Sequence, residues 1–183
     1  SFQGVSFKTS GGNDHLISDL TWDGGTPYAS RIKWETAVRD KDHFNFVLEP
    51  SFFSVNNNKW EIANESTIQI NKDTISVTEL KIEHENQFIS FDGKISNQDK
   101  HKLDFDMTNI DLSQLAAFIA GDIRLKGRLN SWGHISNPMN NLTFEGDAHI
   151  MGFAVNENEI GDIFAHSEWD EPTKSIQLDG DLM

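Results

Sequence analysis

The sequence predicts an all-β protein, a curved antiparallel meander in the form of a half-pipe. Three observations in its 183 residues predict this fold class. Apolar and polar residues alternate with a period of two over most of the chain, which is typical of strands with one buried face. Clusters of Gly, Asn, Asp and Pro separate these runs, so short connections should join antiparallel neighbours. Four runs contain the pattern apolar–x–Gly–x–apolar, which favours curvature.

The first half of the chain carries its apolar side chains mainly at even positions. The parity is odd at Ile75–Val77 and returns to even at Leu80–Ile82, which predicts a β-bulge near Thr78 and Glu79. The alternating runs that predict strands before the bulge are Leu16–Trp22, Tyr28–Val38, Phe44–Leu48, Trp60–Ile62 and Ile68–Ile70.

From residue 89 onward the apolar side chains of each run occupy positions of a single parity. This parity is odd in most runs and even in Leu142–Ile150 and Ile176–Leu182. With the first half, this gives roughly a dozen short strands. The runs that predict strands here are Ile89–Ile95, Leu103–Met107, Ile123–Leu129, Leu142–Ile150, Ile163–Trp169 and Ile176–Leu182.

The repeated pattern places one glycine on the apolar side of four strands. A glycine there leaves a gap in the side-chain layer and lets the sheet curl with its apolar face inside. The glycines expected to set this curvature are Gly93, Gly127, Gly146 and Gly180.

One segment departs from the period of two and predicts a short helix near residues 111–120. Asp111 and Gln114 are expected to form a capping box, and Gly121 stands where a C-terminal cap belongs. The helix should cover one end or edge of the sheet. The residues with the helical spacing are Leu112, Leu115, Ala116 and Ile119.

Composition narrows the classes of partner. There are 15 Lys and Arg against 29 Asp and Glu, a net charge of −14, which argues against nucleic acid and against adsorption to an anionic membrane. Cysteine is absent, so there is no disulfide framework or thiol chemistry. Residues 1–183 are expected to form one continuous unit, a segment of a longer protein, because both ends of the sequence fall within strand-like runs.

The sequence does not predict an active site. Seven histidines are scattered without metal-ligand spacing, and the carboxylates occupy the polar positions of strands, where a solvated face explains them. No nucleophile elbow or phosphate-binding glycine loop occurs. We therefore expect a protein that is not an enzyme, with no catalytic residue, metal or cofactor.

A sheet with one apolar face must cover that face. It can pack against a second sheet, close on itself, or hold an apolar cargo in a groove. We favour the groove, because the helix is too short for a sheet of about a dozen strands, which at ~4.8 Å each exceeds ~50 Å. The side chains expected to line it are Phe44, Phe46, Ile68, Ile70, Ile89, Phe91, Leu103, Phe105, Ile123, Leu125, Leu142, Phe144, Ile163, Ile176 and Leu178.

In the second half of the chain a short strand, the helix and a glycine precede another strand with the glycine pattern. This order, and the strand signatures after it, resemble the AsmA-like family and within it the TamB group, over roughly residues 88–182. The segments that carry the resemblance are Asn109–Leu115, Gly121, Ile123–Leu129, Pro138, Leu142–Gly146, Phe153–Val155, Ile160–Gly161, Trp169–Asp170 and Ile176–Gly180.

The resemblance implies a periplasmic segment of a long envelope protein of Gram-negative bacteria, anchored in the inner membrane by an N-terminal helix. Such proteins fold as a β-taco, a curved sheet with an apolar interior, and are implicated in moving phospholipids towards the outer membrane. The implied partners are phospholipid or another acyl-chain cargo, and neighbouring segments of the same long chain at both open edges. A BamA-like outer-membrane barrel, with a role in outer-membrane protein assembly, would bind through regions outside this sequence.

The five tryptophans support an alternative function. A β-sandwich module that binds carbohydrate, or acts as an adhesin, would use exposed tryptophans as platforms. Trp132 and Trp169 lie near predicted strand ends and are the expected exposed pair, whereas Trp22, Trp34 and Trp60 share the apolar parity of their strands. A structural spacer without cargo is a third possibility.

Overall fold

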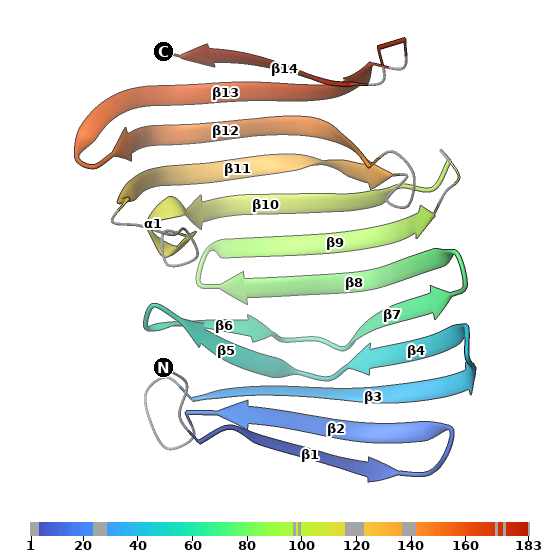
Figure 1. The fold of residues 1–183 in the computed structure, drawn as a ribbon. Coiled ribbons are helices and arrows are strands. Elements are labelled where there is room, and N and C mark those ends of the chain that lie inside the picture. The colour runs from blue at the N-terminus through green and yellow to red at the C-terminus, as the bar shows by residue number, and fades with distance from the viewer. Residues whose placement is uncertain are drawn as a thin grey trace.

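The computed structural model describes residues 4–23, 29–96, 98, 100–115, 123–136, 142–170, 172–173 and 175–182. These residues form one 14-stranded antiparallel sheet and one short helix (Figure 1). The elements are β1 (Ser6–Gly11), β2 (His15–Trp22), β3 (Ser30–Asp40), β4 (His43–Leu48), β5 (Ser51–Val55), β6 (Asn58–Ile62), β7 (Ser66–Asn71), β8 (Thr74–His84), β9 (Gln87–Ser96), β10 (Leu103–Asp111), α1 (Leu112–Leu115), β11 (Leu125–Ser136), β12 (Thr143–Val155), β13 (Asn158–Asp170) and β14 (Ser175–Leu182).

The predicted all-β antiparallel meander is confirmed. Twelve of the strands follow one another in chain order on either side of a single excursion, the hairpin β5–β6. This hairpin fits between the ends of β3 and β8, with Phe52 opposite Arg31 and Glu61 opposite Glu83. Alternation did not predict β1 or β5 as separate strands, because Ser6–Gly11 is mostly polar and Ser51–Val55 places two phenylalanines side by side.

The predicted bulge in β8 is confirmed. The register between β8 and β9 shifts between Val77 and Leu80, and Glu79 has a φ of 54°. The extra residue keeps Val77 and Leu80 on the same side of the sheet. The backbone N–H of Glu79 donates to Oδ2 of Asp92 at 2.9 Å.

The four predicted curvature glycines have different environments. Gly93 and Gly127 have φ values of 120° and 128°, and Gly127 stands at a register shift between β11 and β12. Gly146 does not have a positive φ. A Cβ at this position would lie 2.4 Å from the carbonyl oxygen of Trp132, because Gly146 and Gly133 lie opposite each other with their backbones close together. Gly180 makes only an ordinary contact, so the backbone does not require glycine at this position.

The helix begins as predicted, but its cap differs from the expectation. Oδ1 of Asp111 accepts a hydrogen bond from the backbone N–H of Ser113 at 3.0 Å, which is the expected N-cap contact. The backbone N–H of Asp111 donates to Oε1 of Gln87 at 2.8 Å and not to Gln114. The capping-box assignment of Gln114 is therefore wrong, because β9 supplies the acceptor.

Gln114 instead ties the helix to the hairpin β5–β6. Its Oε1 accepts from the indole N–H of Trp60 at 3.1 Å, and its backbone carbonyl accepts from the side chain of Asn56 at 3.3 Å. The helix thus lies at one margin of the sheet, as Figure 1 shows. Ala116, Ile119 and Gly121, which were expected to extend and end the helix, lie outside the described residues.

Burial is shallow for a chain of this size. A compact monomer of 20.7 kDa exposes about 8,900 Å², whereas this chain exposes 11430 Å². Among the described residues only eight hydrophobic side chains are buried, and the most buried large one, Ile110, is still 2% exposed. No second sheet faces the strands in the described ranges, so the architecture is not a sandwich.

Candidate functional site

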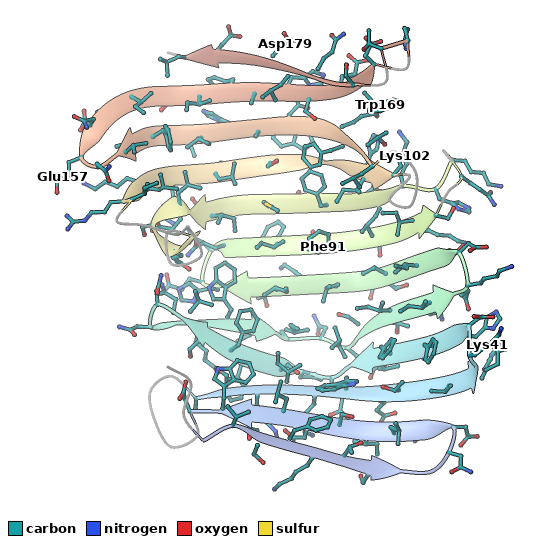
Figure 2. All side chains as sticks on the ribbon, viewed as in Figure 1. Lys41, Phe91, Lys102, Glu157, Trp169 and Asp179 are labelled. Carbon is teal, nitrogen blue, oxygen red and sulfur yellow. The ribbon has the colours of Figure 1, made fainter. Side chains whose placement is uncertain are left out.

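One face of the sheet carries apolar side chains from β1 to β13, and on β14 Leu182 lies opposite Ile163. Directly opposed residues of an antiparallel ladder lie on the same face, and their register establishes this continuity. Phe44 lies opposite Ile70, and Phe91 lies opposite Phe105; Phe91 is near the centre of the sheet in Figure 2. The residues that define this apolar face are Phe7, Leu20, Ile32, Trp34, Val38, Phe44, Phe46, Ile68, Ile70, Ile75, Val77, Ile82, Ile89, Phe91, Leu103, Phe105, Met107, Leu129, Ile135, Phe144, Ile150 and Ile163.

Most of the predicted lining residues lie in these ladders. Leu125 belongs to the far end of β11, where it lies opposite Val155. Leu178 lies opposite Ser167 on the outermost strand and is 72% exposed. The ladder residues among the predicted set are Phe44, Phe46, Ile68, Ile70, Ile89, Phe91, Leu103, Phe105, Leu125, Phe144, Ile163 and Leu178.

Three predicted lining residues differ from the rest. Ile123 and Leu142 precede β11 and β12 and are 41% and 57% exposed, so they belong to strand approaches and not to the ladders. The backbone of Ile176 lies opposite Trp169 on β13, and its side chain lies outside the description.

The apolar face includes residues that the sequence-based selection left out. Met107 lies opposite Ile89, Ile135 lies between Leu103 and Phe144, and Ile150 lies opposite Ile163. Each shares the apolar parity of its strand, so the alternation itself was the signal that could have found them.

Aromatic stacking fills one of the gaps that glycines leave. The rings of Phe105 on β10 and Phe144 on β12 stack with centroids 5.1 Å apart, although β11 separates their strands. Phe105 lies opposite Gly133, and Gly133 lies opposite Gly146, so the two rings can meet over the glycine of the middle strand. Here the glycines make room for aromatic packing, whereas the sequence predicted open space.

The apolar face also holds small polar residues, and their hydroxyls are satisfied by the sheet. Ser66 donates to the carbonyl of Glu79 at 3.0 Å, and Ser131 donates to the carbonyl of Asp147 at 2.8 Å. Ser167 donates to the carbonyl of Phe144 at 2.8 Å. Because these donors are occupied, a ligand on this face meets carbon and little hydrogen-bonding capacity.

The opposite, polar face carries the charges. Lys33 pairs with Glu49 at 3.1 Å, and Arg31 pairs with Asp19. The hydrogen bond from Arg31 holds the pKa of the Asp19 carboxyl below its usual range. The side chains of both ion pairs remain partly exposed to solvent, so the pairs keep this face hydrated and add little to stability.

The described residues offer no cluster of three or more His, Cys, Asp or Glu that could bind a metal ion. Nor does any helix within the described ranges have the length and hydropathy to cross a membrane. Comparisons with models of known protein families, with curated proteins and with solved structures found no match for this chain.

Proposed function

We propose that this chain is a non-enzymatic segment of a periplasmic bridge between the inner and outer membranes, and that its apolar face shields phospholipid acyl chains. The observation that carries the proposal is the continuous apolar face without a facing layer among the described residues. Soluble proteins seldom expose apolar patches of more than a few hundred Å², and larger ones mark sites for apolar ligands or partners.

The physical task of such a face is to replace water around hydrocarbon. Burial of one methylene is worth about 0.8 kcal/mol, so an acyl chain of about sixteen carbons meets a cost on the order of 12 kcal/mol in bare water. Side chains such as Phe46, Ile68 and Ile89 supply carbon contacts along the sheet. The hydroxyls of Ser66, Ser131 and Ser167 donate to backbone carbonyls of the sheet, so they do not need water as an acceptor when an acyl chain covers this face.

The two outer strands support the proposed partners. Both β1 and β14 pair on one side only within the described sheet, so each leaves backbone groups that a further strand can use. Neighbouring segments of the same long chain would extend the apolar face at both edges. The resemblance to the AsmA-like family and the TamB group supports the envelope location, and a BamA-like partner would bind elsewhere in that longer chain.

Native mass spectrometry of the purified protein tests the proposal. We expect bound phospholipid that is released when the protein is denatured and that exchanges with added lipid. A protein that remains free of lipid after incubation with vesicles of phosphatidylethanolamine and phosphatidylglycerol would contradict it.

The alternative function, a β-sandwich module that binds carbohydrate, is supported in part by the structure. The β-sandwich that this function was predicted to use does not match the single sheet of the described residues. Trp132, however, is 53% exposed on the polar face, as a sugar-binding platform requires. Trp169, the other tryptophan predicted to be exposed, is half-buried and lies opposite Ile176 on the side of the apolar face.

A further inference from the structure

The polar face carries a pocket of about 380 Å³ over β11, β12, β13 and β14. Two neighbouring rows of side chains cross these strands. In the first row Trp132 lies opposite Asp147, which lies opposite His166, which lies opposite Asp179. Figure 2 shows Asp179 on β14, the last strand of the sheet.

The second row places an aromatic wall beside the first. His149 and Phe164 lie opposite each other and stack with ring centroids 4.0 Å apart and an interplanar angle of 14°. Trp132 therefore shares a pocket with a second flat surface. An indole that is more than half exposed on a charged sheet face is unusual, because burying its large apolar area is favourable.

The polar groups of the pocket include both donors and acceptors. Oδ1 of Asn130 accepts the backbone N–H of Asn109 at 2.9 Å, which leaves the amide N–H groups of Asn130 to donate. His166 uses Nδ1 for Asp147 at 2.8 Å, so Nε2 is the remaining ring nitrogen. Asp179 and Asp181 form no ion pair with the residues that the structure describes.

One ring nitrogen in the pocket wall lacks a hydrogen-bond partner. Nε2 of His149 is shielded from water and makes no hydrogen bond within the described part of the chain. The carboxylate of Asp162 is 3.9 Å from it, beyond hydrogen-bonding distance. A buried nitrogen of this kind is costly unless another group satisfies it.

We infer that this pocket binds a sugar ring of an oligosaccharide, with Trp132 as the stacking platform. The C–H face of a pyranose packs against an indole, and its hydroxyls both donate and accept. Carboxylates, an amide and imidazoles in one pocket match that double requirement. A lysine or arginine side chain of another protein, as the alternative ligand, would pair only with the carboxylates of the pocket and would leave the amide N–H groups of Asn130 without an acceptor. The site does not depend on the proposed lipid function, because it lies on the opposite face.

Isothermal titration calorimetry of the full chain with cellotetraose, chitotetraose and maltotetraose tests this inference. We expect saturable binding of at least one of the three. Trp132→Ala should abolish it, and Trp132→Phe, which keeps a smaller ring, should weaken it about tenfold. The matched control is Phe88→Ala, which removes an aromatic ring from the same face where Lys81 lies over it, and it should bind as the unchanged chain does.

Three results would overturn the inference. These are no binding of any of the three sugars up to about 10 mM, equal affinity in Trp132→Ala, and binding of a polylysine peptide at Trp132 without binding of sugar. Circular dichroism of each variant verifies the fold. Lipid retention measured on Trp132→Ala keeps the two proposals apart, because loss of the sugar site should leave it unchanged.

Discussion

At the scale of single residues, backbone geometry separates glycines that the sequence pattern treats alike. Gly93 has a φ of 120°, and a Cβ there would lie 2.5 Å from the carbonyl oxygen of Lys102. Gly180 has an open surrounding in which the nearest atom, the carbonyl oxygen of Phe164, is 3.4 Å from such a Cβ. The same five-residue pattern thus marks one position where the fold requires glycine and one where it does not.

We expect Gly93→Ala to lower the free energy of unfolding by about 1–3 kcal/mol, because the side chain would meet backbone in a φ region that alanine rarely adopts. Gly180→Ala is the control and should change the free energy of unfolding by no more than about 0.5 kcal/mol. Urea denaturation followed by circular dichroism measures both. Equal effects of the two substitutions would show that the backbone at Gly93 tolerates a side chain.

A titratable pair on the polar face gives a second prediction at this scale. The hydrogen bond that the His166 ring donates to the Asp147 carboxylate raises the pKa of His166, and the negative charges of Glu168 and Asp179 raise it further. Because the folded-state pKa lies above the ordinary value of 6.5, the pair stabilises the fold fully below that value. This contribution disappears as the pH rises through the raised pKa of the folded state.

Asp147→Asn should therefore move the pKa of His166 down towards its ordinary value. Proton NMR titration of the imidazole resonances measures this shift directly. His101 is the internal control, since burial and the charges of Lys94 and Lys100 lower its pKa and Asp147 is not among the causes. An unchanged His166 titration in Asp147→Asn would contradict the assignment.

At the scale of elements, the helix depends on contacts that are distant in the sequence. Trp60 and Gln114 are 54 positions apart and are joined by a buried hydrogen bond. Gln87 completes the cap of Asp111 from β9. A local motif could predict where the helix starts. The identity of its distant partners depends on the position of the hairpin β5–β6, which pairs with β8, and on the position of β9.

Gln114→Ala should lower the free energy of unfolding by about 1–3 kcal/mol, because the indole N–H of Trp60 would lose its acceptor in a buried position. Ser113→Ala, one position earlier and exposed, is the matched control and should have the smaller effect. Thermal unfolding monitored by tryptophan fluorescence measures both. A larger loss for Ser113→Ala would mean that local capping, and not the tie to the hairpin, holds the helix.

At the scale of the whole molecule, alternation was sufficient to predict a one-sided antiparallel sheet and its bulge at Glu79. It also predicted that most of the selected apolar residues share one face, since parity fixes the face of each side chain once pairing is antiparallel. Alternation could not predict that the hairpin β5–β6 leaves the main strand order. Its pairing with β3 and β8 depends on the register between strands that are distant in the sequence. Nor could it foresee that Phe105 and Phe144 stack over Gly133, because that contact crosses a strand and depends on two pairings at once.

The alternation of faces also provides a sharp test of the lipid proposal. Ile89 and Phe88 are adjacent, large and half-buried, yet Ile89 lies on the apolar face opposite Ile82 and Met107, whereas Phe88 lies on the polar face beneath Lys81. We expect Ile89→Asn to reduce the phospholipid bound per protein several-fold, because a polar amide interrupts the hydrocarbon contact. Phe88→Asn should leave it unchanged. Phe105→Asp is the less decisive variant, because Phe105 is buried and a charge there would also weaken the fold.

The measurement is the ratio of bound phospholipid to protein after incubation with vesicles, with circular dichroism to verify that both variants fold. Both substitutions remove a large apolar side chain from neighbouring positions of β9, so any general loss of stability should affect both alike. Selective loss in Ile89→Asn would tie lipid binding to one side of the sheet. Equal lipid retention in the two variants, or loss in Phe88→Asn alone, would show that hydrocarbon does not bind on the apolar face.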